Sequence, residues 1–135
     1  MVGSFLPIVA GMAITHIQLL SMPVTDQDRA VRFYVDTLGF DLIADNAMGP
    51  AQRWVQVAPK GAATSITLVT WFENMPPGSV GGLVLETDDL DADVAALSQR
   101  GVTFDGGIQA APWGRYVTFK DPDGNGLVLQ ATAVN

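Results

Sequence analysis

The pattern of apolar and polar positions changes period several times along the chain, and each change marks a predicted element. Residues 14–24 are rich in Ile, Leu and Val, which favours a strand. From 26 to 38 the apolar residues recur at helical spacing, with Thr25 or Asp26 as the N-cap and Gly39 as the stop. Apolar runs separated by turn residues then predict three short strands, at 40–45, 53–58 and 65–72.

The second part of the chain repeats this order. Residues 73–79 (ENMPPGS) form a Pro- and Gly-rich connection near the middle. After it we expect a strand at 82–87, then a helix that Asp88 or Asp89 caps and that runs to about Arg100 before Gly101. Further strands are predicted at 102–104, 115–120 and 127–132.

The repeat predicts an α+β fold made of two β-α-β-β-β modules. Residues 26–40 and 89–104 share the order acidic cap, amphipathic helix, glycine and strand. Because one such module cannot bury both faces of its sheet, the two must pair. We expect an N-terminal extension at 1–11 and a single domain at 12–134, divided into module one (about 12–73), a linker (73–79) and module two (about 80–134). The helices cover one face of each sheet, and the other faces form a shared cleft.

Composition narrows the partners and the compartment. The chain has 135 residues and a net charge of −7, and its seven basic residues form no run, so neither nucleic acid nor an anionic membrane is an expected partner. The apolar start lacks the basic residues of a signal peptide and is too short to span a membrane. The absence of cysteine excludes disulfides and thiolate sites and is compatible with the cytosol, so we expect a cytoplasmic protein.

Three segments in this order carry a family resemblance. They are PVTDQDRAVRFYVDTLGF (23–40), GGLVLETDDLDADVAAL (81–97) and TFKDPDGNGLVLQ (118–130). Together they resemble the vicinal oxygen chelate superfamily, which includes glyoxalases, bleomycin-resistance proteins and extradiol dioxygenases. The resemblance covers residues 12–134 and implies the paired-module fold. The DPDGN turn also has a purely structural interpretation, as a tight hairpin in which Gly124 takes a positive φ.

The resemblance implies one divalent metal in the cleft, held by His, Glu or Gln side chains from four strands. The corresponding positions here are Leu19, Thr67, Gly82 and Val128. Three of them have no donor side chain, and a threonine is a poor lone ligand. The one histidine, His16, is three residues from the first position, so strand alternation turns it away from the cleft unless the register slips by one. We therefore expect no metal and no cofactor.

Alternation from these four positions predicts what faces the cleft instead, which is a mainly apolar surface with a few polar groups, as in small-molecule pockets. The candidates are Ile17, Ser21, Val69, Trp71, Val84, Glu86 and Gln130. Glu86 is the candidate catalytic residue: burial in an apolar cleft would raise its pKa and make it a general base. Alternatively, Glu86 lies solvated at a strand end or caps the following helix. Gln130 orients a ligand carbonyl or bonds to a neighbouring strand.

Aromatic and basic residues complete the candidate set. Trp54, Trp71 and Trp113 can stack on a planar ligand, as in antibiotic-binding members of the family, or pack in the core. Arg53 and Arg115, at strand starts, can clamp an anionic group or pair with surface carboxylates. The predicted ligand-binding residues are Ser21, Thr67, Trp71, Glu86, Gln130, Trp54, Trp113 and Arg115.

Two functional classes remain open, and with them the question of whether the protein is an enzyme. The first is a protein that binds a small apolar or aromatic molecule in a metal-free cleft. The second is a metal-independent isomerase, cyclase or lyase that acts on a carbonyl compound with Glu86 as the base. A metal-dependent lyase or dioxygenase is a third alternative. The resemblance also implies a homodimer.

Overall fold

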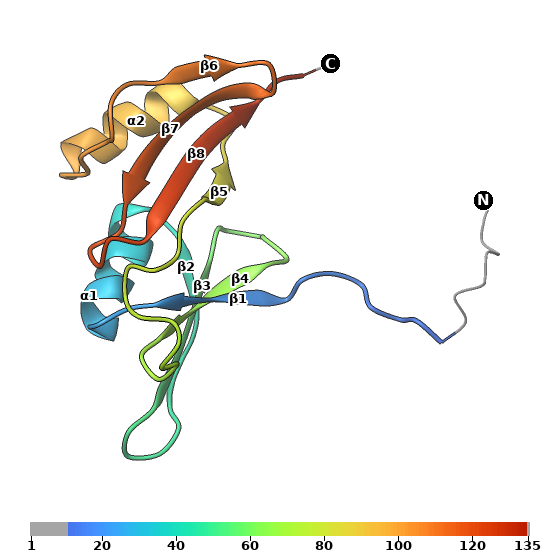
Figure 1. Cartoon of the computed structure of the whole chain (residues 1–135), viewed down its shortest axis with the longest axis vertical. Helices are drawn as coiled ribbons and strands as arrows, with labels where there is room; N and C mark the ends of the chain where they lie inside the picture. The colour runs from blue at the N-terminus through green and yellow to red at the C-terminus, as the bar shows by residue number, and fades with distance from the viewer. Residues whose placement is uncertain (1–10, 135) are drawn as a thin grey trace.

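The computed structural model describes residues 11–134, which form two four-stranded sheets with helices against them (Figure 1). The first sheet has the order β1-β4-β3-β2 and the second β5-β8-β7-β6. β1 pairs with β4 in parallel, as β5 does with β8, and the other pairs of neighbouring strands are antiparallel. The predicted α+β fold of two β-α-β-β-β modules is therefore confirmed.

The strands have the following bounds. The first sheet contains β1 (Leu19–Pro23), β2 (Asp41–Ala47), β3 (Arg53–Ala58) and β4 (Ser65–Val69). The second contains β5 (Leu83–Glu86), β6 (Gln109–Ala111), β7 (Gly114–Lys120) and β8 (Gly126–Thr132). No helix within residues 11–134 has the length and apolarity to cross a bilayer.

Each module has one helical segment whose start is capped by an aspartate. The first is α1 (Gln27–Val31), which continues into the π-helical η2 (Arg32–Thr37). Its cap is Asp26, whose carboxylate accepts from the Arg29 amide at 3.1 Å. The second is α2 (Leu90–Gln99), capped in the same way by Asp89. At each helix start the sequence contains two neighbouring residues that could cap the helix. In both cases the second of them, Asp26 or Asp89, is the observed cap.

Two predicted strands differ from the observed ones. β1 begins at Leu19 rather than at residue 14, and residues 11–16 run away from the body as an extended segment (Figure 1). The predicted strand at 102–104 is wrong: Phe104 makes one isolated bridge, to Phe119. A tight turn follows, in which the Gly106 amide donates to Phe104 O at 3.0 Å, and continuous pairing with β7 is made by β6. Residues 1–10 of the predicted extension lie outside the described residues.

The core lies on the helix side of both sheets and joins the two modules. Its members include Met22 and Tyr34 of the first module and Leu97, Phe119 and Leu127 of the second, all at most 7% exposed. Burial of aromatic and branched side chains of this size is the main source of stability in a domain of this length. Because the core takes the helix-side faces, the opposite faces of the two sheets remain outside it.

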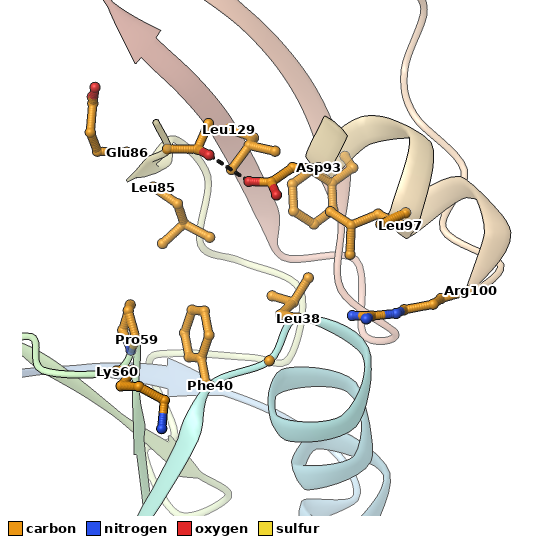
Figure 2. Close-up of a pocket in the computed structure, with 14 residues that line it drawn as sticks. Leu38, Phe40, Pro59, Lys60, Leu85, Glu86, Asp93, Leu97, Arg100 and Leu129 are labelled. Carbon is orange, nitrogen blue, oxygen red and sulfur yellow. Dashed lines mark hydrogen bonds between the residues drawn. The ribbon is translucent and has the colours of Figure 1, made fainter. Parts of the chain in front are cut away.

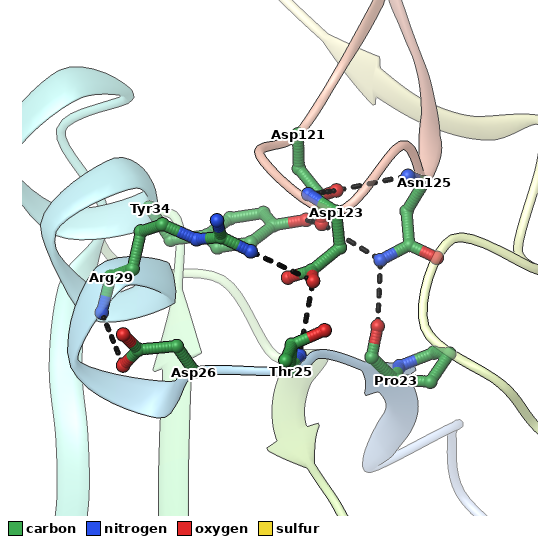
Figure 3. A network of polar contacts seen from close by, with 8 residues as sticks. All are labelled: Pro23, Thr25, Asp26, Arg29, Tyr34, Asp121, Asp123 and Asn125. Atoms are coloured by element: carbon green, nitrogen blue, oxygen red, sulfur yellow. Dashed lines mark hydrogen bonds and ion pairs between the residues drawn. The ribbon is translucent and has the colours of Figure 1, made fainter.

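The DPDGN turn after β7 connects the two modules (Figure 3). Asp121 is 5% exposed, and its Oδ2 accepts from the Tyr34 hydroxyl and from Asn125 Nδ2, both at 2.9 Å. Asn125 Nδ2 also donates to Pro23 O at the end of β1, at 2.8 Å. Burial, and then the Asp121 carboxylate, raise the pKa of Tyr34 far above its usual range, so the phenol stays protonated.

The second aspartate of the turn holds the start of α1. Asp123 Oδ1 accepts from Arg29 Nη2 at 2.9 Å and from the Thr25 amide at 3.1 Å (Figure 3). On its other side the turn touches the linker: a Cβ on Gly78, whose φ is +85°, would lie 2.5 Å from Asp123 O. These contacts support the interpretation of the DPDGN turn as a hairpin with a structural role.

Candidate functional site

The open face of the first sheet carries a polar row across its strands. Ser21 pairs with Thr67, and Thr67 pairs with Gln56, so their side chains share one face. Trp54 lies beside this row and donates its indole N–H to Gln56 Oε1 at 3.0 Å. Gln56 Nε2 in turn donates to Ser65 Oγ at 2.7 Å. The predicted residues Ser21, Thr67 and Trp54 are thus brought together on one surface.

Thr67 is the least accessible of these three. Thr67 is 1% exposed, and its hydroxyl donates to Leu20 O at 3.4 Å. A ligand would have to displace the side chains that cover it. The prediction that Thr67 contacts a ligand therefore finds no support in the geometry of the single chain, whereas half-buried Ser21 and Trp54 remain reachable.

The open face of the second sheet carries a second polar row. Glu86 pairs with Gln130, and Gln130 pairs with Tyr116. Gln130 Nε2 donates to Thr132 Oγ1 at 3.0 Å, and Thr132 Oγ1 donates to Glu86 Oε1 at 2.6 Å. Tyr116 and Thr132 were not predicted. Extending the alternation of β8 by two residues finds Thr132, but Tyr116 requires the pairing of β7 with β8.

Glu86 is not the buried base that the sequence suggested. It is exposed, and hydrogen bonds from the Thr132 hydroxyl and the Thr132 amide, the latter at 3.0 Å, hold the pKa of its carboxyl below the usual range. The expectation of a raised pKa is therefore wrong for the single chain, because it required burial in an apolar cleft. Glu86 is a carboxylate near neutral pH and acts as a hydrogen-bond acceptor.

Aromatic side chains extend this second face. Trp113, in the turn between β6 and β7, stacks on Tyr116 with ring centroids 6.2 Å apart and an interplanar angle of 19°. Trp113 is 57% exposed, so one side of the stack is open to a ligand. Trp71 follows β4 and packs at a tilt against Phe72, with centroids 6.0 Å apart. The two aromatic pairs therefore belong to different sheets.

Arg115 faces away from this surface. It precedes Tyr116 on β7 and so points to the helix side, where Nη1 and Nη2 donate to the two carboxylate oxygens of Asp91 on α2 at 3.0 and 2.9 Å. Of the two alternatives for Arg115, an anion clamp or a pair with a surface carboxylate, the structure therefore shows the second. Arg53 is engaged in the same manner, since it donates to Asp45 and to Asp28.

Glu86 lines two of the cavities that lie where the modules meet. The first, of about 390 Å³, is mainly apolar and is lined by residues of both sheet edges, among them Leu20, Ser65, Ile66, Leu83, Val84 and Glu86. The second, of about 280 Å³, lies on the helix side and is shown in Figure 2. Volumes in this range suit small organic molecules.

The residues at the expected metal positions do not fit a metal. Leu19, Gly82 and Val128 carry no donor atom, and the Thr67 hydroxyl is buried against a main-chain carbonyl. His16 is exposed, lies before β1 and shares a 2.8 Å hydrogen bond with Thr15. Within residues 11–134 no three His, Asp or Glu side chains are grouped in a way that could hold a metal ion.

The fold defines a class of proteins, those built from paired β-α-β-β-β modules with open sheet faces. Comparison with known proteins identifies the family. The profile of the Glyoxalase/Bleomycin resistance protein/Dioxygenase superfamily matches residues 13–129. The chain therefore belongs to this superfamily, as the resemblance of its three segments implied.

Several relatives are similar over nearly their whole length. The crystal structure of TnmS3, an antibiotic binding protein from Streptomyces sp. CB03234, is 57% identical, with a TM-score of 0.85 over 90% of this chain and 99% of that one. A superfamily member from Sphaerobacter thermophilus DSM 20745 is 39% identical, with a TM-score of 0.81 over 87% of this chain and 98% of that one. The uncharacterized protein YetH of Bacillus subtilis (strain 168) is 38% identical over 120 residues, which are 87% of this chain and 98% of YetH.

Proposed function

We propose that this protein binds a small, largely apolar or aromatic molecule without a metal, and that the ligand is of the antibiotic type. The observation that carries the proposal is the open face of the second sheet. There the exposed Trp113–Tyr116 stack adjoins the polar row of Glu86, Gln130 and Thr132. A flat ring can extend the stack, while the polar row accepts or donates hydrogen bonds at the ring's edge.

Similarity supports the same ligand class. TnmS3 is an antibiotic binding protein by its description, and it shares 57% of its residues with this chain. Trp54, on the open face of the first sheet, supplies a further aromatic surface. The lack of donor side chains at the expected metal positions favours binding over metal-dependent lyase or dioxygenase chemistry.

Quenching of tryptophan fluorescence tests the proposal with defined compounds. Doxorubicin and tetracycline supply flat aromatic ring systems, and kanamycin, which is cationic but not aromatic, controls for attraction to the acidic chain. We expect saturable binding of at least one aromatic compound, with an affinity about tenfold weaker in Trp113→Ala because one stacking partner is lost. Equal binding of kanamycin would show attraction by charge alone and would count against the proposal.

A metal-independent isomerase, cyclase or lyase remains the second candidate, because Glu86 lines the mainly apolar cavity at the module junction. In that case Glu86→Gln abolishes turnover of the carbonyl substrate. In a binding protein the same variant keeps most of the affinity, since the amide oxygen still accepts one of the two hydrogen bonds from Thr132. Turnover that survives Glu86→Gln excludes Glu86 as the base.

We also propose that the protein is a homodimer in which a second copy covers apolar surface that is exposed in the single chain. Ile14, Ile17 and Val84 are 83%, 63% and 51% exposed. We infer that these exposed apolar side chains form part of the interface between the two copies. Light scattering coupled to gel filtration should give twice the chain mass for the wild type, and the mass of one chain for Ile14→Asp/Ile17→Asp. A monomeric wild type would contradict this assembly. A cytoplasmic location stays a prediction that rests on composition.

A further inference from the structure

The helix-side cavity between the modules is separate from the proposed binding face (Figure 2). We propose that it is a second binding site, for a small monocarboxylate with an apolar body, and that the carboxylate pairs with Arg100. Of the residues that form the proposed binding face, only Glu86 also lines this cavity. This proposal therefore does not depend on the proposed function.

The floor of the cavity is apolar and comes from both modules. Leu38 and Phe40 belong to the first module, and Leu97, Phe119 and Leu129 belong to the second. The volume, about 280 Å³, is at the lower end for ligand pockets, so it fits a molecule the size of a single substituted ring rather than a drug-sized compound. Four charged side chains, Lys60, Glu86, Asp93 and Arg100, also line the cavity, so the position of a ligand depends on which of them are free to pair with it.

Arg100 supplies the charged group. It follows α2, and its Nη1 donates to Thr37 O of the first module at 2.7 Å, which holds the guanidinium across the junction. Figure 2 shows it directed toward Leu38 at the edge of the cavity. Arg29, Arg53 and Arg115 are each paired with a carboxylate, whereas Arg100 makes no ion pair within residues 11–134. Its remaining donors match the planar fork that a carboxylate binds.

The other charged groups around the cavity leave this position to an anion. Lys60 pairs with Asp41 at 3.4 Å, and Figure 2 shows the Glu86 carboxylate directed away from the cavity. Asp93 accepts a hydrogen bond from the Thr87 hydroxyl. It precedes Arg100 by two helical turns, a rise of about 10 Å along α2. An acid can thus place its carboxylate at Arg100, two turns from Asp93, and its apolar body over Leu97 and Phe119.

A nuclear magnetic resonance titration with benzoate and with its neutral isostere benzamide tests the site. We expect weak, saturable shifts of the amide resonances of Leu38, Leu97 and Arg100 with benzoate. Binding of benzamide should be about tenfold weaker because it lacks the charge that pairs with the guanidinium. Arg100→Gln should likewise weaken the binding of benzoate about tenfold.

The matched control is Arg32→Gln. Arg32 also makes no ion pair within the described part of the chain, is exposed, and does not line the cavity, so its loss changes the net charge equally. Arg100→Lys keeps the charge but not the fork and should retain part of the affinity. Three results would overturn the proposal: no shift at about 20 mM benzoate, which nearly saturates a site with a dissociation constant of about 1 mM; equal binding of benzamide; or equal effects of Arg100→Gln and Arg32→Gln.

Discussion

Removal of the Tyr34 hydroxyl tests whether the DPDGN turn holds the two modules together. Tyr34 is fully buried and donates to Asp121 Oδ2 at 2.9 Å. A hydrogen bond to a charged acceptor contributes about 1.5–3 kcal/mol. Asp121 keeps three other donors in Tyr34→Phe, namely the amides of Asp123 and Asn125 and the side-chain nitrogen of Asn125. We therefore expect the lower end of this range, about 1.5 kcal/mol.

Urea denaturation at a fixed protein concentration measures this loss. With an m-value of about 2 kcal/mol/M for a chain of this size, the midpoint should fall by about 0.8 M. Tyr116→Phe deletes the same hydroxyl from a half-buried tyrosine whose hydroxyl has no hydrogen bond to another described residue, and should change stability by less than about 0.5 kcal/mol. Equal midpoints for the two variants would show that the buried Tyr34 hydroxyl contributes nothing specific to stability.

Three further predictions follow from particular contacts. The folded pKa of Tyr34 lies above its unfolded value, so the unfolded chain loses its phenol proton first; stability should fall above about pH 10, and less steeply in Tyr34→Phe. Gly78→Ala should lower the free energy of unfolding, measured by urea denaturation, by about 1–3 kcal/mol, because alanine is strained at a positive φ. Gly81→Ala should not lower it, because Gly81 has no positive φ and an added Cβ would meet nothing within 4 Å. Arg115→Gln should leave doxorubicin affinity unchanged in the fluorescence titration, because Arg115 faces α2; a clear loss would return it to the site.

Local signals in the sequence were sufficient for the helix starts. Asp26 and Asp89 each precede an amphipathic run, and a cap acts within one turn of its own helix. The strand β6 depends instead on pairing with β7 across a tight hairpin. Its three residues carry no apolar alternation of their own, so the sequence predicted a strand at 102–104 in its place.

The candidate site was predicted in part for the same reason. Alternation correctly implied that Glu86 and Gln130 share a face, because the side-chain period of a strand is a local property. The exposure of Glu86 depends on what covers that face, which no local pattern contains. Arg115 is different: buried Val117 and Phe119 on the same strand already indicated that it points toward the helix side.

Isothermal titration of doxorubicin into protein treated with a chelator tests the central claim most directly. We expect saturable binding with one site per chain, unchanged by the chelator and weakened about tenfold by Trp113→Ala. Binding that disappears in the chelator and returns on addition of Zn²⁺, Ni²⁺, Mn²⁺ or Fe²⁺ would contradict it. That result would mean that side chains other than those at the four expected positions hold a metal, and it would favour lyase or dioxygenase chemistry.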